Sequence, residues 1–247
     1  MTRRRWIADE VSGNHATLTG SHADHLTRVL RARVGQEFDI VADSSVRRGT
    51  IASIADGRVE FDLGEEVESG GTAAQLVLLL AIFKFDRMEW AIEKCTELGV
   101  ERIVPVIARR TDSHLAASSA KRVERWRRIT AQASEQSRRT TLPEVDEPSK
   151  LRDAINLPAS LKIVLAESEK HTRLADIFSS GTGDKILLAI GPEGGWTGEE
   201  LQLFQKEGWN SASLGPTILR AETAAIAATA ITMAELNRWS CTQGEKS

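Results

Sequence analysis

The chain has 247 residues, of which 41% are hydrophobic, and its formal net charge is −3 at pH 7. This length and composition allow one large or two modest domains, each with its own core. The longest apolar run, residues 76–83, is far shorter than the roughly 20 residues that span a bilayer, and the arginine-rich start leads into acidic residues instead of a signal-peptide core. We therefore expect a cytoplasmic protein with no membrane partner.

Cysteine and histidine usage gives no sign of a metal. The two cysteines, Cys95 and Cys241, are far apart and form no CxxC pair, so neither a disulfide framework nor a zinc site is indicated. His22 and His25 lie three residues apart, but no further ligand stands near them in the sequence. We expect no bound metal.

The sequence pattern of the first part of the chain predicts strands and one helix. Short, partly alternating segments separated by turn residues predict strands. A helix is expected from Ser21 or Asp24, with Leu26, Val29 and Leu30 on its buried side. The arginines of this helix, among them Arg28 and Arg31, would then face solvent or a partner. We predict a small barrel-like module over residues 1–70 with strands at 6–7, 15–18, 37–41, 49–54 and 58–63.

The pattern changes after an acidic, glycine-bearing stretch at residues 64–74, where we place a domain boundary. From there strands alternate with helices, which predicts a mostly parallel sheet covered on both faces over residues 74–242. Its apolar runs are continuous, as in strands buried on both sides. We expect strands at 76–82, 103–107, 161–166 and 185–190, and helices at 88–98, 118–138, 174–178, 199–207 and 221–237.

Positive charge gathers in the middle of the chain. Residues 73–142 hold 13 lysines and arginines against 8 aspartates and glutamates. The arginines cluster around Trp126, and arginine forks beside an aromatic face suit phosphates and unpaired bases. A solvated basic helix face is an equally good interpretation of this run alone.

Two glycine-containing loops dominate the last third of the chain, at residues 191–200 and 214–223. The first follows the apolar run 186–190, and Thr197 and Glu200 have the spacing of a capping box that begins a helix. No P-loop lysine follows the glycines, and their spacing is not that of a dinucleotide-binding loop. We therefore favour a small cofactor cradled by backbone groups, although each Gly-Pro pair alone is more typical of an ordinary turn.

Both loops resemble the C-terminal motifs of SPOUT RNA methyltransferases, and more closely those of the family that methylates N3 of a uridine in small-subunit ribosomal RNA. Residues 84–100 and 133–139 resemble the family's middle motifs, and the early barrel resembles its PUA-like RNA-binding domain. The resemblance runs almost end to end. The sequence departs from the family pattern at Arg138, Thr217 and Ala221.

The resemblance implies an α/β SPOUT fold with a C-terminal trefoil knot and an N-terminal PUA-like β-barrel. It also implies S-adenosylmethionine as cofactor, 16S rRNA within the 30S subunit as substrate, and a homodimer. The alanine-rich last helix would pack within the knot or against the second subunit, with a plain core helix as the alternative.

We expect three groups of site residues, of which the resemblance, carried over by position, assigns the cofactor-binding group. Glycines suit the cofactor loops because adenine and ribose can then lie directly against backbone. The cofactor-binding residues would be Leu165, Ala166, Glu167, Gly191, Glu193, Gly194, Gly195, Leu214, Gly215, Ile218, Leu219 and Thr223. The RNA-binding residues would be Arg28, Arg31, Arg122, Arg125, Arg128 and Arg138, and the catalytic residues Arg220, Arg139 and Glu222.

Methyl transfer to uracil N3 requires loss of the N3 proton, so a group that stabilises the uracil anion is needed. Arg220 is the first choice for this role, because a fixed guanidinium near O2 or O4 meets the developing charge. Arg139 is the second, as charge stabiliser or phosphate clamp. Glu222 or Glu193 could accept a proton or brace a loop, and bracing is favoured for Glu193. Ribose 2′-O methylation and a non-catalytic RNA-binding or assembly role are the alternative functions.

Overall fold

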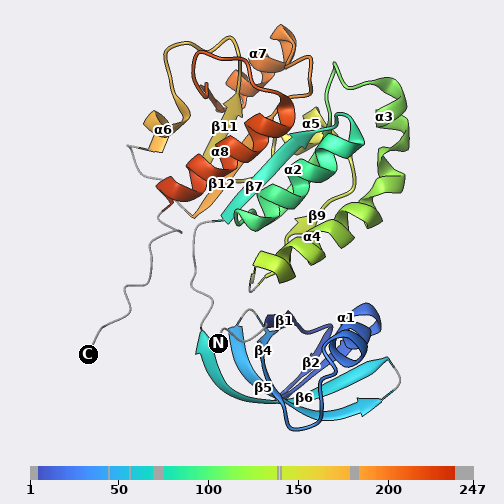
Figure 1. The fold of residues 1–247 in the computed structure, drawn as a ribbon. Helices are drawn as coiled ribbons and strands as arrows, with labels where there is room; N and C mark the ends of the chain where they lie inside the picture. The colour runs from blue at the N-terminus through green and yellow to red at the C-terminus, as the bar shows by residue number, and fades with distance from the viewer. Residues whose placement is uncertain are drawn as a thin grey trace, which may run out of the picture. The chain divides into compact units, whose positions relative to one another are not determined.

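The computed structural model describes residues 5–43, 45–55, 57–68, 75–137, 139, 141–178 and 184–236. The chain divides into two compact units, one of residues 1–72 with 134–142 and the other of residues 73–133 with 143–247. Each unit has its own sheet and its own hydrophobic core (Figure 1).

The first unit is built on a six-stranded sheet in the order β1-β4-β5-β6-β3-β2. All of its pairings are antiparallel except that of β1 with β4. Every strand that the sequence predicts here is confirmed, but β2 was missed because its three residues include only one apolar side chain, Val11. β6 also continues into the stretch predicted as a linker. The strands are β1 (Arg5–Ile7), β2 (Glu10–Ser12), β3 (His15–Thr19), β4 (Glu37–Ala42), β5 (Ser45–Ala55) and β6 (Arg58–Glu68).

This sheet curls because one short stretch of chain pairs with both of its edges. β1 lies beside β4, and the same stretch then crosses over so that β2 lies beside β3. The Ala8 amide donates to the Val41 carbonyl at 3.0 Å, and the next amide, of Asp9, donates to the Thr17 carbonyl at 2.9 Å. Register shifts between β5 and β6 add the local bends that curvature requires. The result is a half-barrel around a core that includes Leu18 and Phe61.

The helix of the first unit departs from the predicted one. α1 (Gly20–Asp24) continues into a π-helical turn, η1 (His25–Val29), in which the Leu30 amide donates to the His25 carbonyl five residues back. The wider turn rotates later side chains relative to an α-helix. Leu26 is fully buried as predicted, but Val29 is 65% exposed, so its predicted place on the buried side is wrong.

The second unit contains a seven-stranded sheet in which every pairing is parallel, in the order β10-β8-β7-β12-β11-β13 with β9 beside β8. The predicted parallel sheet is therefore confirmed. Several short elements of this unit were not predicted, among them α3 (Ser113–Ser118), β9 (Glu144–Val145), β10 (Ser149–Lys150) and α5 (Leu151–Ala154). The strands are β7 (Gln75–Ala81), β8 (Arg102–Ile107), β9 (Glu144–Val145), β10 (Ser149–Lys150), β11 (Leu161–Leu165), β12 (Lys185–Ile190) and β13 (Asn210–Ala212).

Helices cover both faces of this sheet (Figure 1). One face packs against α2, α4, α6 and α8, and the other against α5 and α7. The long helix expected over residues 118–138 is interrupted by a 3₁₀ turn, η2. The helical elements are α2 (Phe85–Glu97), α3 (Ser113–Ser118), η2 (Ser119–Arg122), α4 (Val123–Ser137), α5 (Leu151–Ala154), α6 (Leu174–Ile177), α7 (Gly198–Lys206) and α8 (Ala221–Glu235).

The carboxyl half of α8 packs closely on the end of α2. Gly99 ends α2 with φ +107°, and a Cβ there would lie 2.8 Å from the Met233 Cε atom of α8. The Thr229 hydroxyl lies 3.4 Å from the Cys95 sulfur. Burial raises the pKa of the Cys95 thiol to about 12, so this cysteine remains an inert core residue. Cys241 and Asn237 lie outside the described residues.

The π-helical turn generates a test by paired substitutions. Leu26→Ala should destabilise the first unit by about 2–5 kcal/mol, because it empties a fully buried position. Val29→Ala should change stability by no more than about 0.5 kcal/mol, because that side chain faces solvent. Urea denaturation, with hydrogen exchange of β3 to β6 peptides to localise the change, measures both. Equal effects of the two substitutions would contradict the π-helical register.

Candidate functional site

A cavity of about 670 Å³ lies at the carboxyl ends of β11, β12 and β13. Its volume is within the range of about 300–1,000 Å³ that small-molecule sites occupy. Ligands bind at this edge of parallel sheets because loops from several strands meet there. The walls come from residues 165–168, 190–196 and 212–221, together with Arg87, Arg110, Gly198, Leu201 and Ala224.

The first glycine loop is a tight turn. The Gly195 amide donates to the Pro192 carbonyl at 2.8 Å, and Gly195 has φ +67°, a conformation that favours glycine. The next residue, Trp196, anchors the loop by packing its buried ring edge-on against Phe204 of α7, with ring centroids 5.0 Å apart. The backbone of the turn is thereby held against the cavity.

The predicted capping box at the start of α7 is confirmed. The Thr197 hydroxyl accepts from the Glu200 amide at 3.2 Å, and the Glu200 carboxylate accepts from the Thr197 amide at 2.8 Å. The other oxygen of Glu200 accepts from the Arg109 amide at 2.7 Å. Glu200 thus joins the glycine loop to the turn that follows β8.

Glu200, not Glu193, is therefore the carboxylate that braces this region. Glu193 is exposed, and its side chain makes no hydrogen bond within the described residues. The prediction failed because the capping position of Glu200 places its carboxylate under the loop, where backbone donors converge, whereas Glu193 stands at the outer corner of the turn. Glu193 nevertheless lines the cavity.

The second loop begins just after Ala212 and Ser213, which form backbone hydrogen bonds with the segment that follows β11. The Ala166 amide donates to the Ala212 carbonyl, the Ser213 amide donates to the Thr172 carbonyl, and the Leu174 amide donates to the Ser213 carbonyl, all at 2.9–3.0 Å. Gly215 then has φ +130° and turns the chain along the cavity wall. Residues 166–174 therefore wrap around Ser213.

The structure brings most of the predicted cofactor residues together, since all of them except Thr223 line the cavity. Thr223 is exposed on α8 and does not belong to the lining. Arg220 also lines the cavity, at the position that caps the amino end of α8. Its carbonyl accepts the first helical hydrogen bond, from the Ala224 amide at 2.8 Å, while its side chain is exposed.

Glu222 lies behind the cavity wall. Its side chain is buried, and one oxygen lies 3.8 Å from the Arg87 Nε atom. The other oxygen has no hydrogen-bond partner in the described part of the chain. Because Arg87 lines the cavity and Glu222 does not, this carboxylate is linked to the cavity through Arg87.

Two arginines in the cavity were not predicted as site residues. Arg87 comes from the first turn of α2, and Arg110 comes from the turn after β8. The Arg110 Nη1 atom donates to the Gly194 carbonyl at 2.6 Å. The signal that could have identified Arg110 was its place directly after an apolar strand, at the same sheet edge as the glycine loops.

Arg139 is not among the residues that line the cavity. It belongs to the first compact unit, its amide donates to the Ser134 carbonyl at 2.9 Å, and its guanidinium lies 3.5 Å from the Thr141 hydroxyl. In the same unit, Arg28 forms an ion pair with Asp24 at 3.3 Å, and exposed Arg31 has φ +53°. The structure therefore does not bring these three arginines into the cavity.

The arginines of η2 and α4 lie on the outside of the helix, but the tryptophan of α4 points inward. Arg125 pairs with Glu89 at 2.7 Å, Arg122 lies 3.8 Å from the same carboxylate, and exposed Arg128 has no partner within the described residues. Trp126 is fully buried beside Phe85, so it offers no face to an unpaired base. Helical periodicity places Trp126 on the core side, and that overrides its position among arginines. Arg138 lies outside the described residues.

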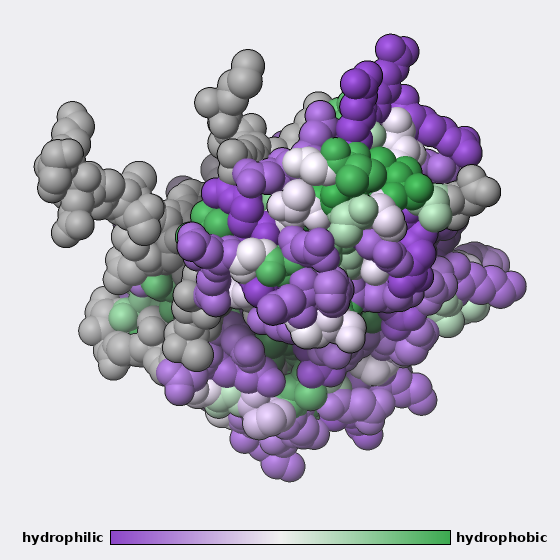
Figure 2. All heavy atoms as spheres, turned by 90° about the horizontal axis from the view of Figure 1, so that it is seen from below, coloured by the Kyte–Doolittle hydropathy of each residue, from purple (hydrophilic) through white to green (hydrophobic). Residues whose placement is uncertain are grey.

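The surface of the first unit carries exposed hydrophobic residues among hydrophilic ones. Figure 2 shows hydrophobic residues interrupting a mainly hydrophilic face. The exposed apolar residues of this unit include Val29 and Val34, at 65% and 61%, which adjoin the exposed Arg28 and Arg31 in sequence.

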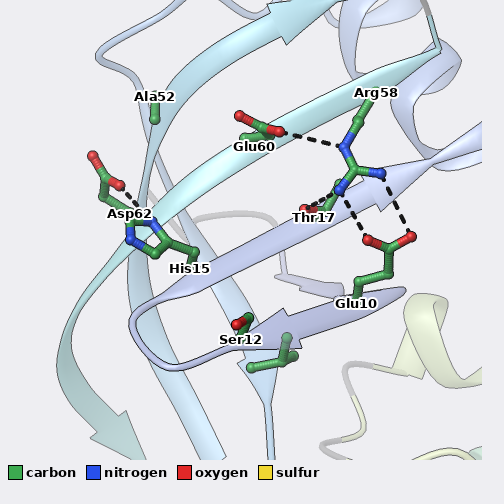
Figure 3. Close-up of a pocket in the computed structure, with 9 residues that line it drawn as sticks. Glu10, Ser12, His15, Thr17, Ala52, Arg58, Glu60 and Asp62 are labelled. Atoms are coloured by element: carbon green, nitrogen blue, oxygen red, sulfur yellow. Dashed lines mark hydrogen bonds and ion pairs between the residues drawn. The ribbon is translucent and has the colours of Figure 1, made fainter.

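A second hollow, of about 400 Å³, lies on the half-barrel and is acidic. In Figure 3, Arg58 reaches Glu10 and Glu60, with nitrogen to oxygen distances of 2.9 and 3.3 Å, and His15 faces Asp62 at 3.0 Å. The carboxylates outnumber the cations, so this hollow disfavours RNA phosphates.

No group of residues that could hold a metal is found among the described residues. His22, one of the two histidines considered above, faces Asp9 and Glu135 of the same compact unit. Its hydrogen bond with the Glu135 carboxylate raises the pKa of His22 above its usual value. Within the same described ranges, no helix is long and apolar enough to cross a bilayer.

Comparison with known proteins decides the family. The family model described as "RNA methyltransferase domain" matches residues 71–233. Ribosomal RNA small subunit methyltransferase E of Synechocystis is 34% identical over 84% of this chain and 69% of that protein, and its counterpart in Rickettsia conorii is 32% identical over 85% of each. The chain belongs to the ribosomal RNA small subunit methyltransferase E family.

A solved structure agrees with this membership. The small subunit methyltransferase E of Neisseria gonorrhoeae, crystallised with bound S-adenosyl methionine, has a TM-score of 0.81 and 29% identity and covers 94% of this chain and 98% of its own. The match spans both compact units. The fold of the methyltransferase E family is therefore shared along nearly the whole chain.

The capping carboxylate generates a test of how the loop is held. Glu200→Gln replaces one acceptor oxygen by an amide donor that must face either Arg109 or Thr197. We expect a loss of about 1–3 kcal/mol in unfolding free energy, measured by urea denaturation. Glu199→Gln, at the exposed neighbouring position of the same helical turn, is the control and should have little effect. Equal losses in the two variants would show that Glu200 does not brace the loop.

Proposed function

We propose that the chain transfers a methyl group from S-adenosylmethionine to N3 of a uridine in 16S rRNA of the 30S subunit, in the cytoplasm. The observation that carries this proposal is the cavity at the sheet edge. Two glycine loops and Arg220 meet there in a chain that belongs to the small subunit methyltransferase E family.

The residues of the cavity fit S-adenosylmethionine. Apolar side chains such as Leu165 and Leu214 suit the adenine ring, and the glycine backbone permits close approach of the ribose. Around Gly195 and Gly215 no atom lies within 4 Å of the position that a Cβ would take. The indole N–H of Trp196, at the same wall, is a buried donor without a partner within the described residues. When bound, the cofactor supplies an electrophilic methyl group on a sulfonium sulfur.

Arg220 supplies the charge that N3 chemistry needs. The N3 proton must leave before or during attack, and negative charge then develops on uracil O2 and O4. The exposed guanidinium of Arg220 stands at the cavity beside the second loop, where it can meet that charge. A guanidinium stays protonated at all relevant pH values, so it acts as an electrostatic stabiliser and not as the base.

Glu222 supports the reaction by holding Arg87. Its burial and its distance of 3.8 Å from Arg87 favour bracing over direct proton transfer. Arg139 would act from the partner subunit of a homodimer, as phosphate clamp or second charge stabiliser. A Glu222→Gln variant with an unchanged pH profile of turnover supports the bracing role. Loss of the acidic limb of that profile, where a carboxylate base would become protonated, contradicts it.

We propose that residues 1–70 form a PUA-like RNA-binding domain and residues 74–242 a SPOUT methyltransferase domain with a trefoil knot. The curled six-stranded sheet supports the first assignment. Residues 166–174, which wrap around Ser213 before the chain continues into α8, support the knot. Limited proteolysis within residues 64–74 tests the boundary, and an experimental chain trace tests the threading.

The proposed RNA contacts are Arg28, Arg31, Arg122, Arg125, Arg128 and Arg138. Because Arg122 and Arg125 share Glu89, part of their charge is already neutralised within the chain. Exposed Arg128 is therefore expected to contribute most to phosphate binding on α4. RNA affinity that does not fall with added salt would contradict a phosphate-based contact surface.

A homodimer is supported by the outer face of α8. Three alanines lie on this face: Ala227 and Ala230 are partly buried, and Ala234 is exposed. Small residues allow a second helix to approach closely. Light scattering of Ala230→Glu, with Ala117→Glu on exposed α3 as control, tests this interface, and an unchanged mass for both variants contradicts it.

The reaction can be tested on ribosomal RNA. Small-subunit RNA from a strain that lacks this protein should lose one N3-methyluridine, and incubation of its 30S subunits with the purified protein and S-adenosylmethionine should restore it. Mass spectrometry of nucleosides measures both. A restored ribose methylation would assign the 2′-O activity, and no change in methylation would assign a binding or assembly role instead.

Arg220→Ala tests the role of the guanidinium. We expect turnover to fall by at least about 10²-fold, as loss of one stabilising charge in a transition state does. Cofactor binding by calorimetry should remain near normal, because the glycine loops are unchanged. Arg152→Ala, an exposed arginine on α5, is the control for the lost charge. Parallel losses of binding and turnover in Arg220→Ala would contradict the catalytic role.

A further inference from the structure

The turn that follows β8 is tied to the first glycine loop at two points. The Arg109 amide donates to Glu200 at 2.7 Å, and the Arg110 Nη1 atom donates to the Gly194 carbonyl at 2.6 Å. One contact uses main chain and the other a side chain. Neither follows from the sequence, because the partners are 91 and 84 residues apart.

The turn itself is rigidly supported. Thr111 closes it, since its amide donates to the Ala108 carbonyl at 3.1 Å and its hydroxyl accepts from the Ala108 amide at 3.1 Å. The same hydroxyl donates to the Ile82 carbonyl, at the end of β7, at 3.2 Å. Arg110 is therefore presented to the loop from a base anchored in two strands of the sheet.

The peptide between Gly194 and Gly195 is held at both ends. Its carbonyl accepts from Arg110, and its N–H donates to the Pro192 carbonyl. A peptide between two glycines is otherwise the easiest in a chain to rotate, because neither residue has a Cβ. The arginine stem lies close to Gly194, since a Cβ there would be 3.2 Å from the Arg110 Cδ atom.

We propose that Arg110 is a positioning residue that fixes the Gly194–Gly195 peptide and so preorganises the loop for the cofactor. This inference rests on the proposed function insofar as it takes S-adenosylmethionine as the ligand. A loop ordered before binding loses less conformational entropy on binding, and that raises affinity. Arg110 therefore acts on cofactor affinity, whereas Arg220 acts on the reaction.

Arg110→Met tests the proposal, because methionine keeps an apolar stem and removes every donor. The dissociation constant for S-adenosylmethionine, measured by calorimetry, should rise on the order of tenfold, as loss of one charge-assisted hydrogen bond implies. Hydrogen exchange of the peptide covering residues 190–196 should become faster in the protein without cofactor. The melting temperature should stay unchanged, and Arg110→Lys should recover part of the affinity.

Arg109→Met is the matched control. It removes the same charge from the same turn, but the loop contact of Arg109 uses its main-chain amide and is retained. Affinity and exchange should match those of the wild-type protein. If Arg110→Met and Arg109→Met behave alike, the proposal is overturned.

Gly194→Ala gives an independent test that also serves if Arg110→Met fails to fold. Its added methyl group would displace the arginine stem and should weaken cofactor binding and speed exchange in the same peptide. Unchanged exchange would overturn the proposal. The exchange measurement needs no cofactor. A failure of the proposed rRNA methylation therefore remains distinguishable from a failure of the proposed positioning role of Arg110.

Discussion

The buried parallel sheet of the second unit is the constraint on which its other features depend. Both faces of this sheet are covered by hydrophobic clusters, so only its edges and the ends of its strands remain available for polar chemistry. Because neighbouring strands all run in the same direction, the loops after β11, β12 and β13 converge at one end. The cavity forms where they meet, and every residue proposed for catalysis in this unit lies in or directly behind its wall.

Some polar side chains near the cavity form hydrogen bonds with backbone, whereas others are exposed to the cavity. Glu200 is buried and uses both carboxylate oxygens on backbone amides, and Arg110 uses one nitrogen on a carbonyl. Within the described residues, the side chain of Arg220 makes no such contact, and it is exposed at the cavity. Groups with backbone partners fix the loop, and the exposed guanidinium of Arg220 is the one that we propose meets charge developing on the uracil.

The two units differ in what the sequence could reveal about their surfaces. In the second unit the helical periodicity of α4 separates buried from exposed positions, and it buries Trp126 although the neighbouring residues are arginines. In the first unit, the π-helical turn breaks the periodicity on which such arguments rest, so Val29 lies outside and not inside. A register shift of this kind depends on how η1 packs on the half-barrel, which local sequence does not specify.

The sequence by itself determined the alternation of strands and helices, the capping box at Thr197 and Glu200, and the family to which the two glycine loops belong. These follow from periodicity, from local hydrogen bonding and from motifs within a few residues of one another. Only the tertiary structure decided that Arg87 and Arg110 enter the cavity, that Glu200 braces the loop in place of Glu193, and that Thr223 stays outside. Contacts between residues 80 or more positions apart depend on how the strands are ordered in the sheet, and no local pattern encodes that order.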